Sequence, residues 1–331
     1  MAPAFRLDRR AFIACAACAA AGTGFAAAGT RFAAADTTQV TAPVTARDPL
    51  KLEKLADGVF VYAAPYELMA PENGGAICNM GVVVGSESAA VIDTGNSVLT
   101  GRRLKEAVRR VTDRPVRYVI NTHMHPDHVL GNAAFRGEGA SFVAHRKMPR
   151  ALAVRTDTYM AQVHRLLGPL GEGTEVVLPD VLVDGRMSLD LGGRELILES
   201  WPTAHTDNDL TVFDEASGTW FLGDLLFVGH VPTLDGSLKG WLALMEALTA
   251  RGTTRVVPGH GPASVAWPMA AGDERRYLDL VQSDVRRLIA AGQPMSVAPG
   301  RVAQSEREKW VLFDEFNPRN AIAAYHEYEW E

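Results

Sequence analysis

The segment NTHMHPDHVLGN (residues 121–132) concentrates ionisable side chains directly after the apolar run VRYVI (116–120). Within six positions it carries His123, His125, Asp127 and His128. Imidazole nitrogens and carboxylate oxygens are ligand atoms that suit zinc. On an extended segment His123 and His125 would point to the same side. A buried polar cluster is costly unless something satisfies it, and a metal ion would do so; the alternative is a surface histidine cluster without a partner.

Three later motifs each place one side chain of a metal-ligating type behind a predicted strand. WPTAHTDNDL contains His205, FLGDLLF contains Asp224, and VVPGHG contains His260. Ligand sites of layered α/β folds collect at the carboxyl ends of strands. Each of these residues alone could be an ordinary loop histidine or turn aspartate. Together, and in this order, they indicate one site.

The elements that must position these residues follow from the spacing of apolar side chains. Strands are predicted over residues 58–64, 76–85, 89–95, 116–120, 141–145, 174–178, 181–185, 186–191, 194–200, 210–224 (with a turn at 215–218) and 254–260. Helices are predicted over residues 98–113, 146–167, 237–252 and 274–292. The last 30 residues or so are also predicted to be helical, with Trp310, Phe313 and Phe316 as docking residues. This mixture indicates an α/β or α+β class with layers packed face to face.

The motifs HMHPDH, TAHTDND, GDLLF and PGHG together resemble the metallo-β-lactamase superfamily, whose pattern is H-x-H-x-D-H, a lone His, a bridging Asp and a final His. The resemblance covers roughly residues 55–290. It implies a four-layer αββα sandwich with the metals at one edge. We therefore expect a domain of this fold over residues 55–292 and a helical C-terminal extension over residues 293–331.

The same resemblance implies a ligand set for two zinc ions per chain. The first ion would be bound by His123, His125 and His205. The second would be bound by Asp127, His128 and His260, with Asp224 bridging both ions. Asp93 in VIDTG would orient ligands rather than bind metal, although a strand-end turn residue is the alternative.

A narrower likeness concerns the segment GDLLFVGHVPTLDGSLKGWLALM (223–245). It is similar to the quinoprotein relay system metallohydrolases, which are related to the Sox-associated hydrolase. This likeness would place His230, Asp235 and Ser237 on a loop close to the metals, with His230 as a further catalytic residue. For Ser237 the alternative is a helix N-cap, because serine commonly accepts a hydrogen bond from the first turn of a helix.

The chemistry implied is metal-assisted hydrolysis of an ester, thioester or lactone-type acyl bond. Two zinc ions roughly 3.5–4 Å apart can share a hydroxide that attacks a polarised carbonyl carbon. Asp127 would also orient this nucleophile, and Asp224 would hold both ions. We expect no serine or cysteine nucleophile, because no G-x-S-x-G is present and Cys78 is far from the motifs in sequence. Cys78 lies in an apolar run and is expected to be a buried, inert thiol.

Three alternatives stay open at this point. A class B β-lactamase would also be exported, but the resemblance implies a residue such as Cys where this chain has Asp224. A persulfide dioxygenase of the superfamily keeps the same motifs and binds one iron, which imidazole and carboxylate also suit. A non-catalytic metal-binding module is the third. Glyoxalase-type thioesterases match all seven ligands, but their glutathione substrates are mainly cytosolic.

The N-terminus carries export signals rather than fold. Arg9 and Arg10 precede an Ala-rich apolar run that ends at Ala33-Ala34-Ala35, which predicts a twin-arginine-type signal peptide over residues 1–35 and a periplasmic protein. An Ala-rich flexible tail is the alternative. Residues 36–54 are Thr/Pro-rich at first and are expected to form a linker or arm. The mature chain should have no membrane span.

Composition limits the partners. The net charge of −6 over 331 residues disfavours nucleic acid binding. A small-molecule substrate is expected, a homo-oligomer is possible, and a link to periplasmic quinoprotein-dependent oxidation follows from family likeness alone. The remaining histidines, His145, His164 and His326, are expected to have no chemical role.

Overall fold

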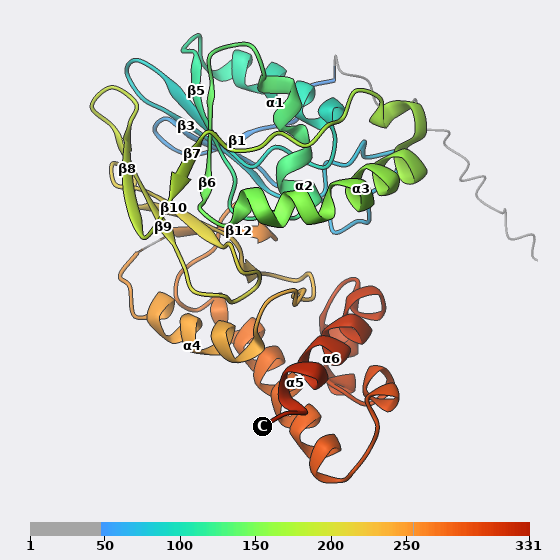
Figure 1. The fold of residues 1–331 in the computed structure, drawn as a ribbon. Helices are drawn as coiled ribbons and strands as arrows, with labels where there is room; N and C mark the ends of the chain where they lie inside the picture. Colours follow the sequence, from blue (N-terminus) through green and yellow to red (C-terminus); the bar gives the residue numbers. More distant parts are fainter. Residues whose placement is uncertain (1–47, 254) are drawn as a thin grey trace, which may run out of the picture. The chain divides into compact units, whose positions relative to one another are not determined.

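The computed structural model describes residues 48–253 and 255–331 (Figure 1). The predicted signal peptide over residues 1–35 and most of the predicted linker lie outside these residues. The described chain is built on two β-sheets of mixed direction, which confirms the predicted α/β class. In this part of the chain, every helix is too short or too polar to cross a bilayer.

The larger sheet has seven strands in the order β1-β2-β3-β4-β5-β6-β7. Its strands are β1 (Glu53–Ala56), β2 (Val59–Tyr62), β3 (Met80–Val84), β4 (Ala89–Ile92), β5 (Val116–Ile120), β6 (Ser141–His145) and β7 (Val181–Val183). Strands β1 to β4 pair antiparallel and β4 to β7 pair parallel. The carboxyl ends of β4, β5 and β6 therefore meet at one edge of this sheet.

The smaller sheet has five strands in the order β12-β11-β10-β9-β8. Its strands are β8 (Arg186–Asp190), β9 (Glu195–Ser200), β10 (Leu210–Asp214), β11 (Thr219–Phe227) and β12 (Arg255–His260). All neighbours pair antiparallel except β11 and β12, which run parallel, with Phe227 opposite His260 at the end of the ladder.

Helices cover both outer faces of the sheets. The α-helices are α1 (Val98–Val111), α2 (Pro126–Val129), α3 (Met148–Leu167), α4 (Leu238–Thr249), α5 (Ala271–Ala290) and α6 (Phe313–Tyr328). Short 3₁₀ segments are η1 (Leu130–Phe135), η2 (Gly168–Gly171), η3 (Met295–Gly300) and η4 (Gln304–Lys309). In Figure 1, α1, α2 and α3 lie by the seven-stranded sheet, and α4, α5 and α6 gather by the other.

The four layers follow from the period-two alternation of the strands. Ile92 packs between the sheets against residues of the smaller sheet, whereas the preceding Val91 packs outward against α1. In β11, Phe221 joins the core between the sheets, while Trp220 and Leu222 pack outward with α4, α5 and α6. Each sheet thus buries both faces, which confirms the expected αββα sandwich with C-terminal helices.

Several predicted elements differ from the structure. Strand β1 begins at Glu53, inside the segment expected to be a linker, and pairs with β2 as a hairpin. The strand predicted over residues 174–178 is wrong, because Val176 and Val177 pack into the helix-covered cores without any pairing strand. Residues 76–79 precede β3 rather than belong to it. Asp127 and His128 lie in the four-residue helix α2.

Candidate metal centre

Most of the candidate ligands come from strand ends and the loops that follow them, but Asp224, predicted to stand behind a strand, lies inside one. His123 and His125 follow β5, His205 follows β9, Asp224 lies within β11, and His260 ends β12. Parallel pairing of β11 with β12 brings Asp224 beside His260. Gly259 makes this approach possible, because a Cβ atom there would lie 1.9 Å from Asp224 Oδ1. The segment around His123 has bends instead of the expected extended backbone, but its side chains still converge.

Three imidazoles converge on one point. Nδ1 of His125 lies 3.1 Å from Nε2 of His123 and 3.0 Å from Nε2 of His205. Asp224 Oδ2 lies 3.6 Å and 3.4 Å from those two Nε2 atoms, respectively. These four groups are close enough to share one metal ion. They are the first predicted ligand set together with the predicted bridging aspartate.

The outer nitrogen of each of these rings is hydrogen-bonded in a way that fixes its tautomer. His205 Nδ1 donates to the carbonyl of Thr233 at 2.7 Å. His125 Nε2 donates to the carboxylate of Asp235 at 3.1 Å. The hydroxyl of Thr122 donates its proton to Asp93, so at 3.1 Å it can only accept from His123 Nδ1. The inner nitrogens of all three rings therefore present lone pairs to one another.

A second group lies on the other side of Asp224. His128 Nε2 is 3.2 Å from Asp224 Oδ1 and 3.5 Å from Asp127 Oδ2. His260 Nε2 is 3.2 Å from Asp127 Oδ2 and 3.5 Å from Asp224 Oδ2. All four predicted ligands of the second ion are thus brought together, and Asp224 faces both groups.

The donor atoms of these residues fit a metal ion. His128 Nδ1 donates to Asp93 Oδ2 at 2.8 Å, so Nε2 is the nitrogen that faces Asp224 Oδ1, at 3.2 Å. Both of these facing atoms are buried and have no hydrogen-bond partner among the described residues. Such a buried pair is unfavourable unless a cation, either a proton or a metal ion, lies between the two atoms. Imidazole and carboxylate donors in this arrangement suit zinc or iron.

Burial and charge set the protonation of the ligands. Burial lowers the pKa of His123 well below its usual range and that of His205 to about 3, which keeps both rings neutral and able to bind metal. Burial would also lower the pKa of His128 and His260, but the anionic groups beside them raise that of His128 well above its usual range and that of His260 to about 9, so these two rings carry protons that a metal ion would displace. Burial alone would raise the pKa of Asp224, but the charge of the surrounding histidines, His128 first, holds it well below its usual range. The bridging group is therefore an anion.

Asp93 follows β4 and occupies the orienting position expected of it. Its backbone has φ of 59°, a left-handed conformation that aspartate tolerates better than most residues. Besides His128, its carboxylate accepts from the backbone N–H and the hydroxyl of Thr122, at 2.8 Å each. It thus holds the segment of His123 and the ring of His128 at once.

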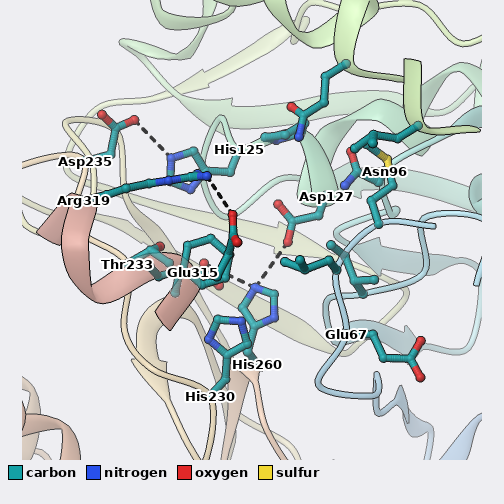
Figure 2. A pocket seen from close by; sticks show the side chains of 18 of the residues that line it. Glu67, Asn96, His125, Asp127, His230, Thr233, Asp235, His260, Glu315 and Arg319 are labelled. Carbon is teal, nitrogen blue, oxygen red and sulfur yellow. Dashed lines mark hydrogen bonds and ion pairs between the residues drawn. The ribbon is translucent and has the colours of Figure 1, made fainter. Parts of the chain in front are cut away.

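The two candidate metal positions open into a cavity of about 600 Å³. Figure 2 shows His125, Asp127, His230 and His260 around this cavity, together with Glu315 and Arg319 of α6. Its apolar wall is formed by Leu68, Met69, Ile77, Leu166, Leu234 and Phe316. This volume is in the range of small-molecule sites.

The structure places His230 in the wall of this cavity. Its ring lies 4.9 Å from the ring of His260 and 5.2 Å from that of Phe316. Nδ1 donates to the carbonyl of Val231 at 2.6 Å, and burial lowers the pKa of His230 to about 4. His230 is thus a neutral imidazole beside a candidate ligand, and its catalytic role stays a prediction.

The other two loop residues differ in their roles. Asp235 contacts His125, as described, and also pairs with Arg155 at 3.1 Å. Ser237 is the N-cap of α4, accepting from the N–H of Gly240, and its hydroxyl donates to Glu327 at 2.6 Å. Ser237 is absent from the cavity lining, so the N-cap alternative accounts for it.

Cys78 is far from the ligand motifs in the sequence but lies close to them in the structure. It is buried, as expected, but its thiol donates to the carbonyl of Asp127 at 2.8 Å, close to the second ligand group. Burial raises its pKa well above the usual range, so it remains a thiol rather than a nucleophilic thiolate.

The other histidines lie outside the cavity lining: His145 is buried and accepts from the N–H of Lys147, while His164 and His326 are exposed.

The contribution of α6 to the cavity could not be predicted from the sequence. This helix contributes Glu315, Phe316, Arg319 and Asn320 to the cavity wall. Phe316 was expected only as a docking residue, and no metal-binding pattern marks the others. The hydrogen bond from His205 to the carbonyl of Thr233 could not be predicted either, because every residue type has a backbone carbonyl.

Comparison with known proteins agrees with this geometry. A family model described as Metallo-beta-lactamase superfamily matches residues 73–260, more than half of the chain. The chain is 38% identical over 52 residues to the linear primary-alkylsulfatase of Pseudomonas sp. (strain ATCC 19151), a stretch that covers 16% of this chain and 10% of that protein.

Two solved structures show the fold. The stereoselective inverting sec-alkylsulfatase Pisa1 from Pseudomonas sp. has a TM-score of 0.66 at 15% identity, over 84% of this chain and 50% of that one. A metallo-beta-lactamase from Pontibacter korlensis has a TM-score of 0.54 at 20% identity, over 70% of this chain and 99% of that one. The chain spans half or less of the length of the sulfatases. The chain therefore belongs to the metallo-β-lactamase superfamily.

Proposed function

We propose that the protein is an exported metallohydrolase that binds two zinc ions and cleaves an ester, thioester or lactone. The observation that carries this proposal is the position of Asp224 between two groups of inward-facing donors. Such a pair of metal positions, when loaded, supplies a nucleophile from water at neutral pH and polarises a carbonyl oxygen. Iron in the same ligands is the alternative metal.

The chain's own residues would orient the reacting groups. Asp127 lines the cavity, and among the described residues no donor is bonded to its Oδ1, which can accept a hydrogen bond from water or substrate. His230 keeps its proton on Nδ1, so its Nε2 is an acceptor beside His260. The apolar side chains of the cavity wall would bind the carbon chain of the substrate and exclude water.

A sulfate ester is the second candidate substrate. The named activity of two similar proteins is alkyl sulfate hydrolysis, and one observation on this chain agrees with an anionic substrate. Arg165 lines the cavity, and no carboxylate of the described residues lies within ion-pair distance of it. By contrast, Arg319 in the same wall pairs with Glu315 at 2.8 Å.

The class B β-lactamase alternative has less support, because Asp224 stands where the family resemblance implies a different residue in those enzymes. The persulfide dioxygenase alternative depends on the metal and would require one iron per chain. A link to quinoprotein-dependent oxidation rests only on the likeness of residues 223–245.

One assay separates these candidates. The purified, zinc-loaded chain would be offered a thioester, an aryl ester, a lactone, an alkyl sulfate and a chromogenic cephalosporin, with the metal content measured on the same sample. We expect chelator-sensitive turnover of the thioester, ester or lactone. Dominant turnover of the alkyl sulfate or the cephalosporin would reassign the substrate, and oxygen uptake on a persulfide with one iron per chain would reassign the reaction.

Export is proposed from the sequence signals alone and has its own test. Replacing both signal arginines by lysine (Arg9→Lys with Arg10→Lys) should leave the precursor in the cytoplasm, because the transport machinery reads the arginine pair. Unchanged export of the double variant would contradict a twin-arginine signal.

A further inference from the structure

The loop between β11 and α4 (residues 228–237, the β11–α4 loop) holds two of the candidate ligands from outside. The carbonyl of Thr233 accepts from His205 Nδ1 at 2.7 Å. The carboxylate of Asp235 accepts from His125 Nε2 at 3.1 Å, and the backbone N–H of Asp235 donates to the carbonyl of His205 at 3.0 Å. The position of this loop therefore decides the orientation of both rings.

Asn320 of α6 holds the middle of this loop. Its Oδ1 accepts from the backbone N–H of Leu234 at 2.9 Å, and its Nδ2 donates to the carbonyl of Pro232 at 2.6 Å. These two groups lie on either side of Thr233. The second proton of Nδ2 goes to Tyr277 Oη at 2.8 Å, so the side-chain amide, buried at 3% exposure, is bonded at both ends.

The two ends of the loop have other backbone anchors, whereas Asn320 is the residue, among those the structure describes, that hydrogen-bonds the backbone of the middle from outside the metal centre. At one end the N–H of Val231 donates to the carbonyl of Val311, and at the other the N–H of Ser237 donates to the carbonyl of Ala204. Between them, Pro232 has no N–H to offer. Apart from Asn320, the hydrogen bonds of residues 232–235 go to candidate ligands or to Arg155. Without Asn320, Thr233 and Asp235 could shift together with the rings of His205 and His125 and would no longer hold these rings in one orientation.

We propose that Asn320 is a positioning residue of the metal centre, acting through Thr233 on His205 and through Asp235 on His125. The C-terminal helix α6 is then part of the metal site and not only a cover for the sandwich. This inference rests on the metal-binding part of the proposed function and is independent of the substrate.

The chain supplies a matched control one turn earlier on the same helix. Asn317 is also buried, at 0% exposure, and its Nδ2 donates to the carbonyl of Val302 at 3.0 Å. Its Oδ1 accepts from Tyr277 Oη at 2.9 Å. Like Asn320, it donates to a backbone carbonyl and is bonded to Tyr277 Oη, but among the described residues it makes no hydrogen bond to the β11–α4 loop.

The test measures zinc affinity of the metal-free full-length protein by competition with a chromogenic chelator. We expect Asn320→Ala to weaken zinc binding about tenfold, the lower end of what loss of an outer-shell partner does. Asn317→Ala should stay within about twofold of the parent protein, although it removes a similar buried amide and should lower the melting temperature of the metal-free protein comparably.

If an alanine variant fails to fold, two aspartate variants at the same positions allow the same comparison. Asn320→Asp and Asn317→Asp leave no cavity and keep one acceptor, but each places an oxygen against a backbone carbonyl, of Pro232 or Val302. Weakened zinc binding in Asn320→Asp alone would support the proposal. Equal zinc affinities for the two variants, or an unchanged affinity in Asn320→Asp, would overturn it. Because no substrate is involved, failure here is distinct from failure of the ester-hydrolase assignment.

Discussion

Asp93 and His128 are joined by a hydrogen bond of 2.8 Å that decides which nitrogen of the ring faces Asp224. The carboxylate can only accept, so Nδ1 of His128 carries the proton and Nε2 is left for a metal ion. Through the ring of His128, this contact links Asp93, at the end of β4 in one sheet, to Asp224 of the other sheet. The second metal position therefore depends on Asp93 without being bound by it.

Asp93→Asn should weaken the second metal position more than the first, because Asp93 bonds His128 directly and reaches His123 only through Thr122. Asparagine tolerates the left-handed backbone at this position, so the fold should survive, but its amide replaces one of two acceptor oxygens by a donor, which meets either His128 Nδ1–H or the N–H of Thr122. Loss of such an outer-shell partner weakens metal binding about 10- to 100-fold. Zinc titration followed by calorimetry should show two sites, of which the one that contains His128 is weakened more. Two sites of unaltered affinity would remove the orienting role of Asp93.

Gly259→Ala should displace Asp224. The added Cβ would lie 1.9 Å from Asp224 Oδ1 and 2.9 Å from the backbone nitrogen of the same residue, so the carboxylate must move. We expect severe loss of zinc content with a folded chain, measured by metal analysis and circular dichroism. Gly252→Ala is the control, since nothing lies within 4 Å of a Cβ at that position. Full zinc occupancy in Gly259→Ala would show that the bridge does not need this close approach.

Glu274 should make stability fall as pH rises. Its Oε1 accepts from the N–H of Phe227 at 3.0 Å, and burial raises its pKa well above the usual range. The folded state thus binds a proton that the unfolded state releases above pH of about 4.5, so the stabilisation is complete below that pH and is lost as pH rises toward the folded pKa. Denaturant unfolding of the metal-free protein at several pH values measures this slope.

The neutral variant Glu274→Gln should flatten that slope. Its amide oxygen can still accept from Phe227, whose ring stacks on His260 with centroids 5.2 Å apart. Glu274→Ala should instead lower stability by about 1–3 kcal/mol at low pH, because a buried N–H loses its acceptor, and by less as pH rises. A pH slope in Glu274→Gln equal to that of the parent chain would show that another group is responsible.

Arg165→Gln tests whether the substrate is anionic. Matched aryl esters of octanoic acid and of suberic acid differ only by a terminal carboxylate. If Arg165 binds that charge, its loss should raise KM for the anionic ester several-fold and leave kcat and the neutral ester nearly unchanged, as expected for an exposed charge pair worth up to about 1 kcal/mol. Arg150→Gln, exposed on the same helix and outside the cavity, is the control. Equal KM changes for both esters would exclude this role.

The ligand residues could be predicted because their types and spacing are local and specific. His123, His125, Asp127 and His128 fall within one short segment after a strand, and the other three ligands reach it from the end of β9, the interior of β11 and the end of β12. Cys78 and Asn320 could not be predicted in the same way. Their proximity to the site depends on how the first strands and the last helix pack, and neither a lone cysteine nor a lone asparagine carries a pattern.

The fold class could be predicted from the alternation of apolar residues, but the structure of residues 174–178 and strand β1 could not. The segment over residues 174–178 has the composition of a strand, yet its valines are packed by helix-covered cores without a pairing strand. Strand β1 lies in a half-exposed hairpin with weak alternation, and composition alone could not separate it from a linker. In both cases tertiary packing decided against local propensity.

The most direct measurement is the zinc content and ester turnover of Asp224→Ala beside the parent chain, both after dialysis against the same trace of free zinc. The parent chain should hold two zinc ions per chain. Asp224→Ala should hold at most one and lose about a hundredfold or more in turnover, because both ligand groups lose a shared carboxylate while the fold remains. Two zinc ions and full turnover in Asp224→Ala would contradict a centre bridged by this residue.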